Sequence, residues 1–358
     1  MIIASSQLVA NPLVSVVIAT YNQVKYIEQT VMSALTQQCP FPFEVVVGDD
    51  GSNDGERELL KKLQEKYPEN LKLIFNDKNM MVTRNYVNAI HEARGKYIAT
   101  LDGDDYYLAK DALVKLVDVL EKNEDVSLVH GGYQSFNDKT GLTIHTFDNK
   151  TGKVLHISTK WESPMLHTKG INSVLALLCN DFNNYPLGSS SCFRKSIYEE
   201  GCIKYKKLID LSDKYIGEGT ILNVSMAMSG KFGYVPEELT AYRVLDSSLC
   251  HYKTKEESFR YFFGYVKLRL HVAEMLEFSP IMIKTMLSKI LRQELNRAKV
   301  SNLINLYIQE VKSLKDIKND VAINTVIREN TSLSVVLPAR ILGCLYSIKS
   351  FLKKILKK

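Results

Sequence analysis

The sequence predicts an α/β fold, in which a mixed, mostly parallel sheet carries helices on both faces and a helical C-terminal region follows. Three observations predict it. Within the first 130 residues, short β-branched runs alternate with segments of helical periodicity. Those runs are apolar almost throughout, which is typical of strands buried on both faces of a parallel sheet. From about residue 253 the chain turns helical and carries no obvious motif.

The elements of the first 130 residues follow one another in a regular order. The predicted strands are 13–20, 43–47, 71–75, 97–101 and 126–129. The predicted helices between them are 27–35, a Glu- and Lys-rich segment ending near residue 66, 83–93 and 113–120. The last of these shows apolar residues at i, i+3, i+4 and i+7. Because such sheets bind ligands beyond the carboxyl ends of their strands, a site is expected just after the strands.

Composition and charge exclude some classes of protein. The chain has 358 residues, 45% of them hydrophobic and 24% charged, as in a globular protein with a sizeable core. Its net charge of +6 arises in residues 339–358, which hold six basic residues and no acidic one. The rest of the chain is therefore neutral. This disfavours nucleic acid as a partner, because a groove that follows phosphates needs a basic face.

The cysteines and the apolar runs bear on location. The six cysteines are scattered, without a CxxC pair or a histidine at zinc-finger spacing. This pattern excludes a zinc ribbon and a disulfide framework and favours a reducing compartment. The N-terminus has no basic region before its first apolar run, and no apolar stretch reaches the roughly 18 residues of a spanning helix. We therefore expect a cytoplasmic protein.

Two acidic clusters follow predicted strands: Asp49–Gly55 and Asp102–Asp105. Carboxylates brought to one edge of a sheet repel one another, and a bound cation relieves that repulsion. An Asp-x-Asp on a turn offers only oxygen ligands, which suits Mg²⁺ or Mn²⁺ completed by water and substrate phosphates. Asp and Gly are also common in ordinary turns. The coincidence of two such clusters after strands of the same sheet favours the metal-binding interpretation.

Three stretches carry a resemblance to a known family: VSVVIATYNQVKYIEQTVMSALTQQ, EVVVGDDGSNDG and TRNYVNAIHEARGKYIATLDGDD. In order and spacing they resemble family 2 glycosyltransferases of the inverting, GT-A (Rossmann-like) type that act on bacterial cell-surface polysaccharides. The resemblance covers roughly residues 13–110, and a weaker one continues to about residue 250. It implies a catalytic domain over 1–250, with a nucleotide-sugar-binding half at 13–130 and an acceptor-binding half at 131–250. A helical extension over 251–332 and a basic amphipathic helix over 333–358 would follow.

The resemblance also implies roles on the nucleotide side. Thr20, Tyr21 and Asn22 would border the nucleotide. Asp50, with Asp49 beside it, would hydrogen-bond the base or the ribose.

The remaining donor residues belong to two further stretches. Arg84 would lie near the base or the diphosphate. Asp102 and Asp104 form the DxD motif, in which Asp104 would hold Mn²⁺ or Mg²⁺ and Asp102 would approach the ribose or a metal-bound water. Asp105 would support these groups or contact the sugar. The chemistry agrees, because a departing nucleoside diphosphate must be neutralised and a divalent ion does so.

The acceptor side needs a base, since an inverting transfer requires a carboxylate that takes the proton of the attacking hydroxyl. In the family a Gly-Asp precedes a helix in the stretch that residues 215–243 resemble, and Glu218 stands at the matching position. Glu218 is the leading candidate for the base and Asp213, five residues earlier, is the alternative. Glu218 could equally be an acid favoured by the start of a helix.

In the family a Gly-Lys and a short strand precede a Tyr-Arg, which Tyr242–Arg243 matches, so the resemblance implies a short strand before Tyr242. A histidine often follows two residues later, but this chain has Leu245 there. No role is therefore carried over to His251.

The end of the chain predicts contact with a membrane. Wound as a helix after Pro338, residues 339–358 place apolar side chains on one broad face and basic ones at its edges and far side. Such a helix is typical of an in-plane position on an anionic leaflet. Docking on the protein's own core is the alternative, but the absence of acids favours the membrane. We therefore expect a peripheral protein on the inner face of the cytoplasmic membrane.

Together these features predict a metal-dependent hexosyl- or N-acetylhexosaminyltransferase. It would move a sugar from a nucleotide-diphosphate donor, with UDP the expected nucleotide, to a hydroxyl of a lipid-linked, cell-surface glycan. A catalytically silent glycan-binding or scaffold protein on the same fold is the alternative. A nucleotidyltransferase is disfavoured, because ATYN follows the first strand where such enzymes have a Gly-rich, basic phosphate loop.

Overall fold

The computed structural model describes residues 1–141, 146–147, 154–155, 164–179, 188–215, 217, 219–245, 254–332 and 335. The chain divides into two compact units. The first comprises residues 1–177, 182–213 and 218–245, and the second comprises residues 178–181, 214–217 and 246–358. The predicted boundary at residue 250 falls outside the described residues and stays a prediction.

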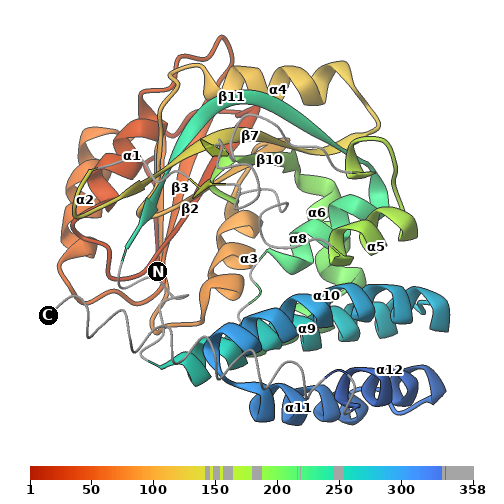
Figure 1. Ribbon diagram of the computed structural model, residues 1–358. Coiled ribbons are helices and arrows are strands. Elements are labelled where there is room, and N and C mark those ends of the chain that lie inside the picture. The colour runs from red at the N-terminus through yellow and green to blue at the C-terminus, as the bar shows by residue number, and fades with distance from the viewer. Residues whose placement is uncertain are drawn as a thin grey trace, which may run out of the picture. The chain divides into compact units, whose positions relative to one another are not determined.

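A nine-stranded sheet forms the first unit, in the order β1-β4-β3-β2-β5-β10-β7-β11-β6 (Figure 1). Its strands are β1 (Ile2–Ile3), β2 (Val14–Thr20), β3 (Phe43–Asp49), β4 (Leu71–Phe75), β5 (Tyr97–Asp102), β6 (Tyr106–Tyr107), β7 (Val126–Asn137), β10 (Ser191–Arg194) and β11 (Lys231–Val244). Strands β2 to β5 are parallel, and β11 is parallel to β7. β10 is antiparallel to both of its neighbours, β5 and β7. The predicted mixed, mostly parallel sheet is confirmed.

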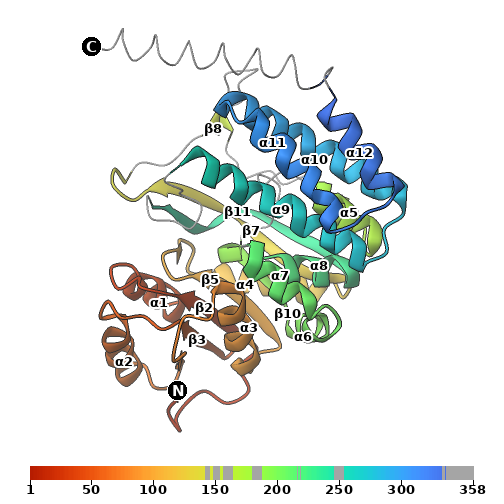
Figure 2. The ribbon, with the colours of Figure 1, turned by 90° about the horizontal axis from the view of Figure 1, so that it is seen from below.

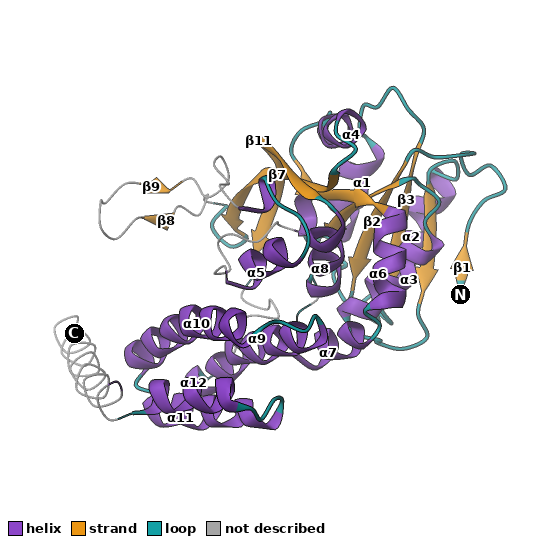
Figure 3. Ribbon diagram, turned by 90° about the vertical axis from the view of Figure 1, so that its right-hand side faces the viewer, coloured by secondary structure: helices purple, strands orange, loops and turns teal. Residues whose placement is uncertain are grey.

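Helices cover both faces of this sheet (Figure 3). The helices up to residue 229 are α1 (Ile27–Leu35), α2 (Glu56–Lys66), α3 (Val82–Glu92), α4 (Ala112–Lys122), α5 (Ile171–Cys179), α6 (Lys195–Lys204), α7 (Lys207–Tyr215) and α8 (Thr220–Ser229), and the last residues of α5 and α7 belong to the second unit. Two short 3₁₀ turns, Pro164–Leu166 and Gly188–Ser190, also occur. The strands β8 (Thr146–Phe147) and β9 (Val154–Leu155) pair with each other in a separate antiparallel sheet.

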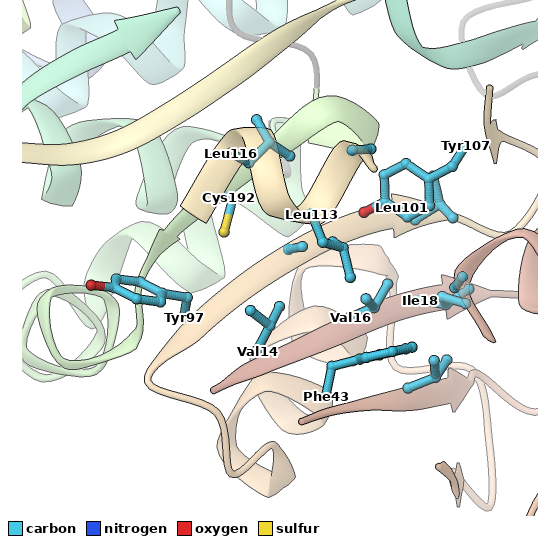
Figure 4. Close-up of a cluster of buried hydrophobic side chains, with 14 of the residues drawn as sticks. Val14, Val16, Ile18, Phe43, Tyr97, Leu101, Tyr107, Leu113, Leu116 and Cys192 are labelled. Carbon is cyan, nitrogen blue, oxygen red and sulfur yellow. The ribbon is translucent and has the colours of Figure 1, made fainter. Parts of the chain in front are cut away.

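The core explains why the strand sequences are apolar throughout. All seven residues of β2 and all seven of β3 are buried. Val14, Val16 and Ile18 of β2 share one hydrophobic cluster with Leu113 and Leu116 of α4 (Figure 4). The intervening residues of β2 are buried on the opposite face of the sheet, as expected for a parallel sheet covered on both sides.

Two strands are longer than the sequence predicts. The predicted strand 126–129 is the start of the twelve-residue β7, and the short strand expected before Tyr242 is the fourteen-residue β11. β11 pairs with β7 over its whole length, with register shifts between Val235 and Thr240. Pro236 lies within these shifts, and it has no backbone N–H to donate to the hydrogen bonds between the two strands. The pattern of the sequence therefore understates the strand.

The second unit contains α9 (Lys255–Met275), α10 (Pro280–Ser301), α11 (Ile304–Lys312) and α12 (Val321–Thr331), with a 3₁₀ turn at Ser313–Asp316 (Figure 2). Helix α12 lies near the end of residues 251–332, for which a helical extension is expected. Its start is capped by Asp320, and α9 begins with a complete capping box between Thr254 and Glu257. Among the helices that the structure describes, none has both the length and the hydropathy to span a membrane.

Candidate functional site

The carboxyl ends of four parallel strands meet at one edge of the sheet. Thr20 pairs with Asp49 across β2 and β3, Ala19 pairs with Asp102 across β2 and β5, and Asp49 pairs with Phe75 of β4. The loop after β2 and both acidic clusters therefore lie along the same edge, which we call the acidic edge (residues 20–23, 49–56 and 102–105).

Thr20 turns its side chain into the protein. Its hydroxyl donates to Glu56 and lies 3.0 Å from Gln23 Oε1. Glu56 is buried and also accepts the Gln23 N–H at 2.7 Å and the Ser52 hydroxyl at 3.1 Å. Burial raises the pKa of Glu56, partly offset by these hydrogen bonds. Thr20 and Glu56 thus hold the first loop against the start of α2.

The next two residues face solvent. Tyr21 has 45% of its surface exposed. Asn22 is exposed and has a φ of +53°, a left-handed conformation that Asn tolerates better than most residues. Its N–H donates to Ser52 Oγ at 2.9 Å, and its Oδ1 accepts the Asn53 N–H at 2.9 Å. The loops after β2 and β3 are therefore bound to each other.

Asp49 and Asp50 differ in their partners. Asp49 is fully buried and forms an ion pair with Arg57, at 2.5 Å between Oδ1 and Nε. Asp50 accepts the Met80 N–H at 2.8 Å and the Asn76 amide at 3.0 Å. Burial raises the pKa of Asp50, an effect that these two donors reduce. Asp49 is held by a charge and Asp50 by neutral donors.

A row of amides lies behind Asp50. Asn85 of α3 donates to the Gly48 carbonyl at 2.7 Å and accepts the Asn76 amide at 3.0 Å. Asn88 donates to Asn76 Oδ1 at 3.0 Å. Helix α3 therefore sets the position of Asp50 through Asn76.

The carboxylate of Asp102 is held on both oxygens by hydroxyl groups. Tyr86 of α3 donates to Oδ1 at 2.6 Å, and Ser189 donates to Oδ2 at 2.9 Å. Ser189 also accepts the Asp102 N–H at 3.1 Å. Gly103 follows in a position where a Cβ would lie 2.2 Å from Gln23 Oε1 and 2.5 Å from Thr20 Oγ1, so a side chain does not fit between the two acids of the motif.

Asp104 and Asp105 experience strong repulsion. Burial and the nearby Asp102 raise the pKa of Asp104 to about 6. The pKa of Asp105, which is 1% exposed, lies well above its usual range for the same two reasons and because of Asp104. Asp105 Oδ1 accepts the backbone N–H of Arg243 at 2.8 Å. The carboxylates of this loop are thus close enough to disfavour each other's charge.

The residues of this loop fit a divalent cation. Neighbouring carboxylates that repel each other gain when a cation is placed between them, and they offer the oxygen ligands that Mg²⁺ and Mn²⁺ prefer. Within the described ranges, no group of three or more His, Cys, Asp or Glu side chains is arranged to hold a metal. The protein would therefore supply few ligands, and water and substrate phosphates would supply the others.

Arg84 lies next to the alternative base. Its Nε is 2.7 Å from Asp213 Oδ2, and the guanidinium also pairs with Asp210. Burial raises the pKa of Asp213, and the charge of Arg84 opposes this shift. The leading candidate, Glu218, lies outside the described residues, and so do His251 and the segment 333–358 apart from Val335.

Sequence reasoning did not single out Glu56, Tyr86 or Ser189. Each of them contacts a predicted site residue from a distant part of the chain: Glu56 contacts Thr20, and Tyr86 and Ser189 contact Asp102. A partial signal existed, since Tyr86 lies in the TRNY stretch and Ser189 lies in the run of small residues before β10.

Comparisons with known proteins agree with this architecture. Residues 15–183 match the family model described as glycosyl transferase family 2. TuaG of Bacillus subtilis, which is named for teichuronic acid biosynthesis, is 40% identical over 111 residues, covering 30% of this chain and 42% of TuaG. The uncharacterized glycosyltransferase MJ1057 of Methanocaldococcus jannaschii is 35% identical over 137 residues, covering 38% of this chain and 46% of MJ1057. The aligned part of this chain thus spans less than half the length of these relatives.

Among solved structures, residues 1–349 of S. aureus TarS, crystallised with UDP, superpose with a TM-score of 0.54 at 17% identity. The superposition covers 94% of this chain and 91% of the TarS chain. At this identity the likeness concerns the fold alone, and it confirms the predicted GT-A architecture with its helical C-terminal region.

Proposed function

We propose that this chain, whose residues 15–183 match the family model of glycosyl transferase family 2, transfers a sugar from a nucleotide-diphosphate donor to a hydroxyl of a growing cell-surface glycan. The transfer inverts the anomeric centre and depends on Mn²⁺ or Mg²⁺. The observation that carries the proposal is the acidic edge, where Asp50, Asp102 and Asp104 follow β3 and β5 of one parallel sheet.

The acidic edge suits a donor with a diphosphate. Asp104 and Asp102 would hold the cation, which supplies charge neutralisation for the departing diphosphate when it is bound. Asp50 accepts the Met80 N–H and the Asn76 amide on Oδ1, and its Oδ2 would accept a base N–H or a ribose hydroxyl of the nucleotide. Asp49 supports this loop through Arg57 rather than by contact with the donor.

The acceptor hydroxyl must lose its proton as it attacks. We assign this step to Glu218, by its place in the segment that resembles the family, with Asp213 as the alternative. Asp213 is less suited, because its carboxylate is engaged by Arg84 at 2.7 Å. The charge of Arg84 also opposes the rise in the pKa of Asp213 that burial causes.

The donor nucleotide is proposed to be UDP, and the sugar a hexose or an N-acetylhexosamine. The support is the fold shared with TarS, for which structures with UDP and with UDP-GlcNAc exist. The name of TuaG supports a cell-surface glycan as the acceptor.

The segment 333–358 would hold the protein at the inner face of the membrane, close to a lipid-linked acceptor. Each Lys or Arg near an anionic surface contributes about 1 kcal/mol of binding. Removal of residues 333–358 should release the protein from vesicles of anionic lipid in a sedimentation assay. Equal sedimentation of the full-length and shortened proteins would exclude this anchor.

The decisive experiment is thermal stabilisation of the full-length protein by UDP-, GDP- and dTDP-sugars, each with and without Mn²⁺. A ligand stabilises the state that it binds, so a metal-dependent shift with one nucleotide identifies the donor. The variant Asp104→Asn should lose this shift while retaining its unliganded melting temperature. If no donor shifts a folded sample, the protein is a silent scaffold or its donor site is completed only by the acceptor or the membrane.

A further inference from the structure

Arg243, at the end of β11, uses every nitrogen of its side chain on a different segment of the first unit. Nε donates to the Asp104 carbonyl oxygen at 2.8 Å. Nη1 donates to Asp138 at 2.6 Å, and Nη2 donates to Gln29 at 2.8 Å. Its backbone N–H donates to Asp105 Oδ1 at 2.8 Å. One residue thus joins α1, the loop after β5, and the ends of β7 and β11.

Aromatic rings fix the plane of this guanidinium. Its carbon lies 4.6 Å from the ring centroid of Tyr26 and 4.8 Å from that of Phe136. Arg243 is 8% exposed. The guanidinium packs against these rings and donates from three nitrogens, which fixes its orientation. A lysine ammonium cannot reproduce this set of contacts.

The charge of Arg243 is already balanced by Asp138, which also accepts the Tyr26 hydroxyl at 3.0 Å. The charge of Arg243 also opposes the rise in the pKa of Asp104, but its hydrogen bonds to the loop after β5 run from Nε to a neutral carbonyl oxygen and from its backbone N–H to Asp105. These bonds fix the peptide that follows Asp104 from both sides, through the Asp104 carbonyl and the Asp105 carboxylate. The direction in which the Asp104 side chain leaves the backbone depends on that peptide.

We propose that Arg243 is a positioning residue for the Asp104 carboxylate, so that binding of the donor's divalent cation depends on the pairing of β7 with β11. This inference rests on the proposed function. It assigns to Arg243 no contact with the donor and no proton transfer.

The experiment compares full-length wild type with Arg243→Lys, which keeps the charge but loses the fork of donors. Two quantities are measured: the Mn²⁺ concentration that gives half of the UDP-dependent thermal stabilisation, and the affinity for UDP in EDTA. Loss of a residue that orients a metal ligand costs about 10- to 100-fold in metal affinity, so the half-saturating Mn²⁺ concentration should rise by that factor. The affinity for UDP in EDTA should keep its wild-type value.

Arg94→Lys is the matched control. Arg94 also forms a fork, to Glu44, but at the amino-terminal end of the strands. It should leave the half-saturating Mn²⁺ concentration unchanged. An equal rise in both variants would overturn the proposal, since it would reflect general destabilisation.

The remaining outcomes are also decisive. A folded Arg243→Lys with the wild-type Mn²⁺ response would overturn this inference alone. A wild-type protein without any Mn²⁺ response would overturn the proposed function and the inference with it. If Arg243→Lys does not fold, Gln29→Ala at the exposed Gln29 removes one acceptor of the fork. It should raise the half-saturating Mn²⁺ concentration, and an unchanged value would contradict the proposal.

Discussion

Glu44 near the start of β3 and Asp104 beyond the end of β5 are carboxylates at opposite ends of the same parallel strands. At the amino-terminal end, both oxygens of Glu44 are satisfied. Oε1 accepts the Ser15 hydroxyl and the Arg94 N–H, both at 2.7 Å, and Oε2 accepts two guanidinium nitrogens of Arg94. At the other end, Asp104 lies near Asp102, whose charge raises the pKa of Asp104.

The proposed function accounts for this difference, with Glu44 holding the fold and Asp104 binding the cation of the donor. A buried charge is tolerated where donors satisfy its oxygens, as those of Glu44 are satisfied. Crowded acids persist when the rest of the fold holds them in place, as Tyr86, Ser189 and Arg243 do here. Under the proposed function, a bound cation would balance the charge of these acids.

The largest loss of turnover should follow from replacing the base. This prediction tests whether an ion pair with arginine marks a carboxylate as structural. Asp213 is paired with Arg84 much as Glu44 is paired with Arg94. Glu218→Gln should lower kcat by about 10²- to 10⁴-fold, the usual contribution of a general base, without loss of donor binding. Asp213→Asn should retain most of the turnover.

Turnover of both variants with a radiolabelled donor, together with donor binding by calorimetry, decides the matter. The reverse result, with Asp213→Asn inactive and Glu218→Gln active, would make a paired carboxylate the base. The comparison between the two ends of the sheet would then lose its predictive value.

A smaller effect, on the free energy of unfolding, is expected from a substitution at the amino-terminal end of the strands. Arg94→Ala removes two charged donors from Glu44, each a hydrogen bond to a charged group of the kind that contributes about 1.5–3 kcal/mol. Because Arg94 is 39% exposed, solvent reduces this loss towards the lower figure.

Urea unfolding of Arg94→Ala measures the lost stability, and assays below the transition measure turnover per folded molecule, which should equal that of wild type. Asp104→Asn should behave in the opposite way, with unchanged stability and lower turnover. An Arg94→Ala protein of wild-type stability but low turnover would show that both ends of the sheet serve the reaction.

Local pattern predicted much of the donor side. The strand at 71–75 has the predicted bounds, and β5 is one residue longer than predicted, because these are short apolar runs bounded by polar residues. The acids after β3 and β5 could be found because they directly follow such runs. β11 was underestimated, since Pro236 and its bulge break the alternation that marks a strand.

The supporting contacts could not be predicted from local pattern. Arg243 reaches Gln29, Asp104 and Asp138, which lie more than one hundred residues away in the sequence. The hydroxyl of Thr20, expected at the nucleotide, is bonded to Glu56 instead, 36 residues later. The spacing of residues along the chain does not predict such long-range contacts, because they depend on how separate elements pack.

Strand β10 has a mechanical consequence. It hydrogen-bonds to β5 on one side and to β7 on the other, so the strands before and after residue 130 belong to one uninterrupted sheet. A sheet of this kind resists bending about an axis between its strands, because hinge motion would break its ladder. This unit is therefore not expected to open and close as two lobes, and under the proposed function access to the site would depend on the loops at its edge.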